Sequence, residues 1–465
     1  MPNKRKMRYV YVLADYLAAA TARFLFFLFR KSYIEQVDFF LYEKDFLFYL
    51  SLWGIPLMWV LWFAFLGHYR NVYRRSRLLE FWHTLTASFI GCSVLFFFLI
   101  LDDVISSYTD YYKLFSALFL LQFICTFIPR LFLFFYTSKK IKSGKIGFKT
   151  LLIGGNSDSL RLYHNLQKNK DKHGHIFVGY ADDPEESGKE LPRLGSLQEI
   201  QKIVKEKQIE EITVPVSYSK TELLQRMIRQ LQYTDTLIKV EPEPFATLQK
   251  RVNLTGFLGV PMQVVSYQPM KAWQENIKKI FDISASFLAI LLLLPVYLFI
   301  AAAIKLDSKG SIFFCQERIG KHGKPFLIYK FRTMRPDAES EGPQLSSEKD
   351  KRVTRLGRFL RKSRLDETPQ FFNVLQGKMS IVGPRPERQF YIDQILQKAP
   401  AYSELLNVKP GITSWGQIKF GYAENVDEML ARLKFDLFYI RNRSLYIDVK
   451  ILIHTVLEVL KGSGK

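Results

Sequence analysis

Four long apolar runs occupy the first 140 residues of the chain. They extend over Tyr9–Phe29, Phe46–Leu66, Phe81–Leu101 and Tyr112–Tyr136. A helix that crosses the hydrocarbon core of a bilayer needs about 20 predominantly apolar residues. The pattern therefore predicts a membrane protein whose N-terminal domain, residues 1–140, is a bundle of four transmembrane helices.

The first run carries two charged residues, Asp15 and Arg23. A charge at the centre of a membrane helix costs about 2.5–3.5 kcal/mol on insertion scales. Such residues usually face the interior of a bundle, where they pair with other polar groups. We therefore expect both side chains to face the bundle, with each as a candidate partner of the other.

Basic residues alternate with acidic ones in the segments that connect the runs. Loops retained in the cytoplasm carry an excess of lysine and arginine. This rule places both ends of the bundle in the cytoplasm, because three segments are basic: Lys4, Arg5, Lys6 and Arg8; Arg70, Arg74, Arg75 and Arg77; and Lys139, Lys140, Lys142, Lys145 and Lys149.

Residues 149–268 follow a different pattern, in which short apolar strands alternate with amphipathic helices. Strands are predicted at Thr150–Ile153, Phe177–Tyr180, Glu211–Pro215 and Leu237–Val240, and helices from Asp158, over Leu197–Lys207 and over Thr221–Tyr233. This alternation is typical of a parallel sheet with right-handed crossovers. We therefore predict a Rossmann-like α/β module on the cytoplasmic side.

The loop after the first of these strands decides between two functions for the module. Its sequence runs from Gly154 and Gly155 through Asn156 to Ser159. A dinucleotide fingerprint needs two further glycines at which the pyrophosphate and the helix approach closely. Their absence favours a structural or regulatory module, such as one that supports a homodimer, over a nucleotide-binding one.

A fifth apolar run, Ile283–Ile304, has Pro295 at its centre. Basic residues flank it on both sides, with Lys278 and Lys279 before it and Lys305 after it. Both flanks therefore favour the cytoplasm. We predict a re-entrant helix over residues 280–306 that is broken at Pro295, with nearby serines to satisfy the freed backbone groups. An ordinary kinked spanning helix is the alternative.

Composition limits the partners of the chain. The net charge of +22 indicates anionic partners, but the 40 Phe and 24 Tyr residues lie largely in apolar runs. Membrane lipid is therefore favoured and nucleic acid is not. The three cysteines, Cys92, Cys125 and Cys315, lack the spacing of metal ligands, and we interpret them as small packing residues.

The remaining chain is polar and basic, and two adjacent carboxylates, Asp366 and Glu367, stand out within it. Thr368 and Pro369 are a good N-cap and first residue for a short helix that Gly377 would end. Helix N-termini attract phosphate, and the nearby Arg361, Lys362 and Arg364 add positive charge. A carboxylate can attack phosphorus to form an acyl phosphate, and a second one can hold Mg²⁺.

The order of the C-terminal segments resembles one enzyme family, the bacterial polyprenyl-phosphate hexose-1-phosphate transferases, or large monotopic phosphoglycosyl transferases. The resemblance covers Trp273–Lys465 and implies a mainly α catalytic domain at residues 273–465. It is carried by Asp366-Glu367-x-Pro369-Gln370-x-x-Asn373-Val374-Leu375, Gly383-Pro384-Arg385-Pro386 and Asp436-x-x-Tyr439-x-x-Asn442-x-Ser444-Leu445-x-x-Asp448. The membrane bundle and the α/β module are similar to the upstream half of the large members.

The resemblance implies an activity of the EC 2.7.8 type that initiates capsule, exopolysaccharide or O-antigen units at the bacterial inner membrane. Asp366 would attack a UDP-sugar, with glucose or galactose as the sugar, and release UMP. Undecaprenyl phosphate would then accept the phosphosugar, and Glu367 would ligate Mg²⁺. The other expected substrate-binding residues are Gln316, Arg318, Lys330, Arg332, Arg361 and Arg385.

The sequence departs from the family pattern at two places, and two other functions are alternatives to the transferase. Ser414-Trp415-Gly416-Gln417 and Thr368 differ from the usual family residues, with consequences for sugar choice or packing. A membrane-tethered NAD-dependent nucleotide-sugar dehydratase or epimerase would need an intact glycine fingerprint and a Tyr-x-x-x-Lys pair, which the α/β segment lacks. A non-enzymatic membrane scaffold is disfavoured by the intact carboxylates and Arg385.

Overall fold

A computed structural model of the chain shows two compact units. The first consists of residues 1–147, 171–174 and 271–273, and the second of residues 148–170, 175–270 and 274–465. The structure describes every residue except 1, 35, 37–45, 71, 75–76, 101–107, 145, 169–173, 183–189, 219–223, 225–226, 228–229, 232–233, 235, 242–253, 256–261, 265–269, 336–349, 351, 422, 424 and 461–465.

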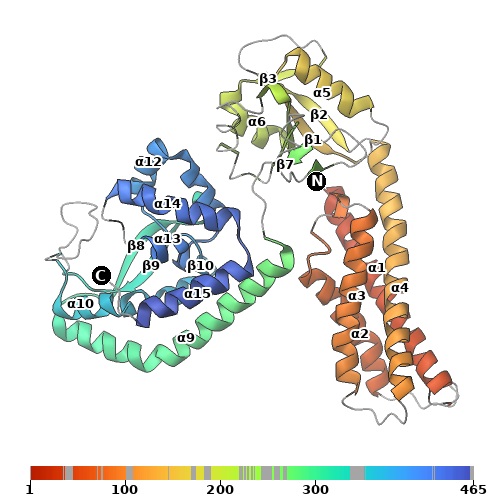
Figure 1. Cartoon of the computed structure of the whole chain (residues 1–465), viewed down its shortest axis with the longest axis horizontal. Coiled ribbons are helices and arrows are strands. Elements are labelled where there is room, and N and C mark those ends of the chain that lie inside the picture. Colours follow the sequence, from red (N-terminus) through yellow and green to blue (C-terminus); the bar gives the residue numbers. More distant parts are fainter. Residues whose placement is uncertain are drawn as a thin grey trace. The chain divides into compact units, whose positions relative to one another are not determined.

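The first unit contains four helices that run side by side (Figure 1). Their bounds are α1 Pro2–Phe29, α2 Phe46–Phe65, α3 Arg77–Ile100 and α4 Tyr108–Lys142, with the short helices η1 Arg30–Ile34 and η2 Val72–Arg74. Among the described residues, segments of α1, α3 and α4 are long and apolar enough to cross a membrane. The described apolar stretch of α2, Tyr49–Phe65, is shorter. The four predicted apolar runs are therefore confirmed as helices.

Arg130 of α4 is buried inside this bundle and is 1% exposed. Its Nε and Nη2 atoms donate to the two carboxylate oxygens of Asp15 on α1, at 2.8 and 2.7 Å. Its Nη1 atom lies 2.8 Å from Nδ1 of His68 and 3.1 Å from the hydroxyl of Thr84 on α3. The hydroxyl of Tyr69 donates to Asp15 at 2.7 Å. One guanidinium group thus links α1, α3, α4 and the segment after α2.

The prediction that Asp15 faces the bundle interior is confirmed, but its suggested pairing with Arg23 is wrong. Arg23 is half-buried and donates from Nη2 to the hydroxyl of Ser51 on α2, at 3.2 Å. Asp15 and Arg23 lie eight residues apart on one helix, about 12 Å along its axis, whereas Arg130 reaches Asp15 from α4 and binds both carboxylate oxygens. Sequence position gives no indication of this contact between residues 115 apart.

The α/β module has a sheet of seven described strands in the order β3-β2-β1-β4-β5-β7-β6. The first five are parallel, whereas β7 is antiparallel to both β5 and β6. The bounds are β1 Phe148–Ile153, β2 His175–Ala181, β3 Arg193–Gly195, β4 Glu211–Val214, β5 Leu237–Val240, β6 Leu254–Thr255 and β7 Met262–Val264, with helices α5 Ser157–Lys168 and α6 Ile200–Lys207 and short helices η3 Leu197–Glu199 and η4 Val216–Tyr218.

Side chains of β1 show how the module is layered. Leu151 and Ile153 pack with α6, whereas Leu152 packs with Leu162 of α5. Because alternate residues of a strand point to opposite faces, both faces of the sheet are covered. The parallel sheet is confirmed, and β3, β6 and β7 were missed. Most of the predicted helix Thr221–Tyr233 lies outside the described residues.

The C-terminal domain is mostly helical, as predicted, and also contains a hairpin, β8–β9, and a parallel pair, β10–β11, that the sequence did not predict. Cys315 lies exposed on β8, so its interpretation as a packing residue is wrong. The bounds are α9 Ala272–Asp307, β8 Phe313–Ile319, η5 Lys321–Gly323, β9 Pro325–Phe331, α10 Arg355–Lys362, η6 Leu365–Glu367, α11 Gln370–Leu375, β10 Ser380–Val382, α12 Gln389–Lys398, η7 Pro400–Asn407, β11 Gly411–Thr413, α13 Trp415–Lys419, α14 Val426–Arg441 and α15 Leu445–Leu460.

Helix α9 contains the fifth apolar run and buries one continuous stripe of side chains. The buried residues are Lys278, Asp282, Ser286, Tyr297, Ile300 and Ile304. Apolar side chains elsewhere on the helix are exposed, including Leu292 at 68% and Phe299 at 75%. The helix continues through Pro295 and changes direction along its length (Figure 1). The expected interruption of the helix is therefore absent, and Ser286 is buried without a hydrogen-bond partner among the described residues.

Candidate active site

The adjacent carboxylates lie in the short helix η6, immediately before α11. Asp366 is 8% exposed and Glu367 is 6% exposed. Arg364 precedes them with a φ of 58°, a left-handed conformation that is uncommon outside glycine. This residue turns the chain sharply between α10 and η6, the short helix that contains both carboxylates.

The predicted capping of α11 by Thr368 is wrong. Thr368 has helical backbone angles, and its hydroxyl donates back to the carbonyl of Leu365 at 2.7 Å. Pro369 then stands at the cap position with a helical φ of −61°. Because η6 runs directly into α11, no free cap is needed at this junction. Gly377 ends the helix with a φ of 75°, as predicted.

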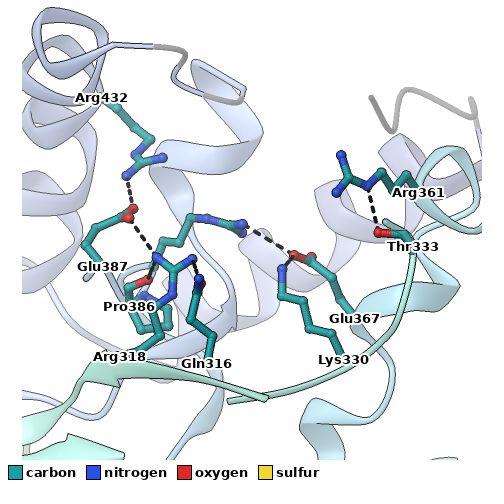
Figure 2. Close-up of polar contacts among 10 residues, drawn as sticks. Gln316, Arg318, Lys330, Thr333, Arg361, Glu367, Pro386, Glu387 and Arg432 are labelled. Atoms are coloured by element: carbon teal, nitrogen blue, oxygen red, sulfur yellow. Dashed lines mark hydrogen bonds and ion pairs between the residues drawn. The ribbon is translucent and has the colours of Figure 1, made fainter. Parts of the chain in front are cut away.

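Glu367 is held by two cationic side chains from other elements (Figure 2). Lys330 of β9 donates to its Oε1 atom at 2.7 Å, and Arg385 donates to the same atom at 3.3 Å. Burial by itself favours the neutral acid, but the charges of Lys330 and Arg385 outweigh it and hold the pKa of Glu367 well below its usual range. Glu367 is therefore the ionised member of the pair.

Asp366 has the opposite environment. Its carboxylate has no hydrogen-bond partner among the described residues. Burial and the adjacent charge of Glu367 raise its pKa to about 6, against the lowering influence of Lys330, Arg361 and Arg385. The pKa values of the two acids thus differ strongly. Glu367 is a fixed anion, whereas Asp366 is a more basic carboxylate that is not engaged.

Arg385 is positioned by the loop that follows β10. This strand pairs in parallel with β11. A Cβ atom added to Gly383 would lie 2.5 Å from the carbonyl oxygen of Lys409 and 2.8 Å from the nitrogen of Gly411. Only glycine therefore fits where the two chain segments approach each other. The loop that carries Arg385 is consequently fixed against its neighbour.

Helix α9 contacts the chain beside both halves of this site. Asp282 accepts hydrogen bonds from the hydroxyl of Ser380 at 2.7 Å and from the backbone N–H of Ile381 at 3.2 Å. One turn earlier, Lys278 donates to the carbonyl of Val382 at 3.0 Å. In the second half of α9, Tyr297 donates to the carbonyl of Thr368 at 3.0 Å. The same helix thus braces β10, which leads to Arg385, and the residue next to Glu367.

We predict that Asp282→Asn lowers kcat/KM for UMP release about tenfold. The loss of a hydrogen bond to a charged group costs about 1.5–3 kcal/mol. The site residues themselves are unchanged, so the effect must pass through β10 to Arg385. Steady-state kinetics measure it, and Asp393→Asn, which neutralises an exposed acid of the same domain, is the control.

A double variant that combines Asp282→Asn with Arg385→Lys separates a positioning role of Asp282 from a general loss of structure. If Asp282 acts through Arg385, the double variant should lose less activity than the two single losses multiplied. An unchanged kcat/KM in Asp282→Asn would exclude the positioning role.

Gln316 and Arg318 lie on β8 beside the Arg385 loop (Figure 2). Arg318 donates to Gln316 at 2.7 Å, to the carbonyl of Pro386 at 3.3 Å and to Glu387 at 3.2 Å. Glu387 also accepts from Arg432 of α14 at 2.6 Å. Burial lowers the pKa of Arg318, which Glu387 counteracts. Gln316 and Arg318, which were expected to bind substrate, therefore support the loop that carries Arg385.

The two remaining predicted arginines differ in their surroundings. Arg361 donates from Nε to the hydroxyl of Thr333 at 3.0 Å, and its charge lowers the pKa of Asp366. Arg332 is directed to the end of α9, where it donates to the carbonyls of Ser308 and Lys309 at 2.7 and 2.9 Å. The structure brings Arg361 towards the carboxylates and uses Arg332 to anchor the end of α9.

Sequence reasoning missed four residues that shape the site, namely Lys278, Asp282, Glu387 and Arg432. The spacing of four between Lys278 and Asp282 was a usable signal, because it places them on one helix face. Glu387 and Arg432 gave no such signal, since 45 residues separate them.

The residues Asp436, Tyr439 and Asp448, which carry part of the resemblance, make structural contacts. Asp436 accepts from the backbone N–H of Gly416 at 3.0 Å, and Tyr439 donates to Asp448 at 2.7 Å. Asp448 in turn forms an ion pair with Lys278 at 3.0 Å. These contacts attach α14 and α15 to α13 and α9.

The donor set near the carboxylates suits a magnesium ion that arrives with its substrate. The described residues contain no cluster of three His, Cys, Asp or Glu side chains that would hold a metal ion by itself. Mg²⁺ is commonly bound by one or two carboxylates together with water and substrate phosphates. Asp366 and Glu367, as two adjacent buried carboxylates, fit that arrangement.

Comparison with known families divides the chain at other points than its two compact units do. A family described as "Bacterial sugar transferase" matches residues 273–462, and one described as "CoA-binding domain" matches residues 64–241. The first match contains α9 and every element of the carboxylate site. The second covers α3, α4 and the strands β1 to β5 of the module.

Three relatives show the extent of the similarity. The chain is 45% identical to the UDP-N-acetylgalactosamine-undecaprenyl-phosphate N-acetylgalactosaminephosphotransferase of Aeromonas hydrophila over 40% of its own length and 44% of the relative. It is 40% identical to the UDP-glucose:undecaprenyl-phosphate glucose-1-phosphate transferase of Caulobacter vibrioides over 39% and 69%. The galactosyl transferase CpsE of Streptococcus agalactiae is 29% identical over 91% and 94%. For several relatives the match spans about half of their length, from 44% to 62%.

Proposed function

The chain belongs to the bacterial sugar transferase family, and we propose that it transfers a hexose-1-phosphate from a UDP-sugar to undecaprenyl phosphate. The observation that carries this proposal is the division of labour between the two buried carboxylates. Glu367 is fixed by Lys330 and Arg385, whereas Asp366 is unengaged and has a raised pKa of about 6. A nucleophile beside a fixed anion and two cations suits phosphoryl transfer.

The proposed reaction has two displacements at one phosphorus atom. An oxygen of Asp366 attacks the sugar-bearing phosphorus, and the bond to the bridging oxygen breaks, so that UMP leaves. An oxygen of undecaprenyl phosphate then attacks the same phosphorus, and the aspartyl oxygen departs as a carboxylate. Lys330 and Arg385 provide positive charge for the diphosphate oxygens, Arg385 with a guanidinium that can bind two of them.

Magnesium enters this proposal through Glu367, which would hold it together with the diphosphate. When bound, the ion supplies charge neutralisation for the diphosphate and the leaving UMP. Glu367→Gln should weaken the dependence of UMP release on Mg²⁺ and shift the titration to higher concentrations. A titration of the variant that superimposes on that of the native enzyme would exclude Glu367 as a ligand.

The rate of the first displacement should fall as the pH is lowered, because Asp366 becomes protonated. Its pKa is raised to about 6, so the reactive carboxylate predominates above that pH and is lost below it. Glu367 stays ionised over this range because its pKa is lowered. The burst of UMP released in the absence of undecaprenyl phosphate isolates this step. With the acceptor present, its phosphate monoester would itself titrate at a pH of about 6 and would obscure the titration of Asp366. A burst rate that stays constant down to pH 5 would contradict the assignment.

We place the site at the cytoplasmic face of the bacterial inner membrane. Residues before and after Pro295 contact the same domain, as Asp282 and Tyr297 do. A helix that crossed the bilayer would carry its two ends to opposite sides, whereas α9 keeps both on one. Its exposed apolar residues then lie in lipid as a re-entrant helix, and the basic residues at both ends meet anionic headgroups.

A UMP-release assay with undecaprenyl phosphate and a panel of UDP-sugars tests the proposed function. UDP-glucose, UDP-galactose and UDP-N-acetylgalactosamine form the panel, because the relatives' names include these sugars. Lipid-linked product and UMP should appear in equal amounts with one donor. Absence of product with every UDP-sugar would overturn the proposal and favour the scaffold. The expected homodimer stays a prediction.

A further inference from the structure

The five parallel strands of the α/β module lie within a region that matches a CoA-binding family. In open parallel sheets a ligand binds beyond the carboxyl ends of the strands, where the chain changes direction in the sheet. Here that point lies between β1 and β4, because β2 and β3 extend the sheet on one side of β1 and β4 and β5 extend it on the other. The phosphates of such a ligand are bound by backbone N–H groups of the loop after the first strand.

A carboxylate of the chain itself occupies this loop. The N–H of Gly155 donates to Oδ2 of Asp182 at 2.6 Å. Asp182 directly follows β2 and is 1% exposed. Its other oxygen, Oδ1, accepts from the hydroxyl of Tyr218 at 2.9 Å. An N–H that would meet a phosphate oxygen is therefore engaged by an internal anion.

The space beside the loop is also filled. A Cβ atom added to Gly154 would lie 2.5 Å from both the ring of Tyr218 and the hydroxyl of Ser159. Gly154 itself has a φ of 86°, so the chain turns here and lies against the ring. In a dinucleotide site this close approach is made by the pyrophosphate. In this chain Tyr218 makes it.

The start of α5 is capped from within as well. The side chain of Asn156 accepts from the N–H of Ser159 at 3.0 Å, as a helix-capping residue does. At the end of β5, Glu241 adds a second acid, and its Oε2 atom accepts from the N–H of Val216 at 3.4 Å. A phosphate group would therefore meet negative charge and engaged donors at this edge of the sheet.

We propose that Asp182 is an internal substitute for a ligand phosphate, which closes the module to coenzyme A and to dinucleotides. Burial of a carboxylate is costly unless hydrogen bonds compensate it, and Gly155 and Tyr218 provide them. The module is then a ligand-free element whose glycine loop is held by its own chain. This inference is independent of the transferase activity.

Equilibrium dialysis of the full chain in detergent, with radiolabelled coenzyme A and NAD⁺, tests the closure. Saturating UDP-sugar is present to exclude binding at the transferase site. We expect no saturable binding of either compound up to millimolar concentration. Saturable binding of one molecule per chain would overturn the proposal.

Hydrogen exchange tests whether Asp182 is the residue responsible. In Asp182→Asn the backbone amides of the glycine loop, residues 154–156, should exchange at least tenfold faster than in the native chain. Asp158→Asn is the matched control, because it neutralises an exposed acid two residues beyond this loop, and its exchange should match the native chain. Unchanged exchange in Asp182→Asn would overturn the role of the carboxylate.

Discussion

Asp366→Asn should abolish UMP release, with a loss of at least about 10³-fold in kcat, because removal of a catalytic nucleophile can cost about 10⁶-fold. The amide has the shape of the carboxylate but cannot form an acyl phosphate. Native enzyme given a UDP-sugar labelled at the sugar-bearing phosphorus should retain label on the protein after denaturation. The variant should retain none. Label on the variant, or sustained turnover by it, would assign the nucleophile elsewhere.

The stability of the same variant provides its control. Asp366 is buried beside an ionised Glu367, and this raises its pKa. A raised pKa means that the folded state disfavours the charged form, so a neutral amide relieves the repulsion at neutral pH. Thermal unfolding of Asp366→Asn should therefore occur at the same temperature as in the native protein or above it. A loss of activity together with a lower unfolding temperature would point to misfolding instead.

The elements that follow from local pattern were predicted well, because apolar runs and alternation determine them. The four bundle helices, α9 and the strand Leu237–Val240 lie where the sequence places them. Element ends were less accurate, and α4 extends beyond its predicted run at both ends. The strands β3, β10 and β11 were missed because each has only three residues. The hairpin β8–β9 was missed although β9 is an apolar run, because β8 mixes apolar and charged residues and shows no clear alternation.

Within the site, the carboxylates and Arg385 were found by motif, whereas their support was not. Thr368 had the residue type of an N-cap, yet the preceding helix η6 leaves no cap to fill. Arg332 belongs to the same motif as Lys330, but β9 ends at Phe331, so the strand alternation that would place both side chains on one face does not extend to Arg332. One of them therefore contacts Glu367 and the other contacts the end of α9. Such outcomes depend on tertiary placement, which a single sequence does not encode in its local pattern.

Helix α9 gives the carboxylate site a physical connection to the membrane. Its hydrogen bonds from Asp282 and Tyr297 reach β10 and Thr368 respectively, on the two sides of Glu367. The exposed apolar residues that we propose to lie in lipid and the residues that brace the site therefore belong to one helix. A soluble nucleotide-sugar and a lipid phosphate can both reach a site held in this way.

Arg130→Met should destabilise the transmembrane bundle by about 3–5 kcal/mol, the usual cost of leaving one buried charge without its partner. Asp15 would remain 1% exposed, with the Tyr69 hydroxyl as its remaining hydrogen-bond donor among those described here. Methionine preserves the length of the side chain, so the loss reports the charge and the hydrogen bonds. Unfolding of the full chain in mixed detergent micelles measures the change.

Two comparisons separate the ion pair from a general intolerance of substitution in α4. Arg23→Met removes a half-buried arginine of the same bundle that donates to Ser51, and it should cost less than about 1.5 kcal/mol. Asp15→Leu combined with Arg130→Met removes both charges of this pair, and it should recover part of the stability, because apolar replacements of a buried ion pair are often neutral. The recovery is incomplete because the buried Glu80, 3.6 Å from Arg130, still loses its cationic partner. If the double variant is less stable than Arg130→Met alone, Asp15 contributes through contacts other than the ion pair. The role of the Arg130–Asp15 ion pair in stabilising the bundle would then be wrong.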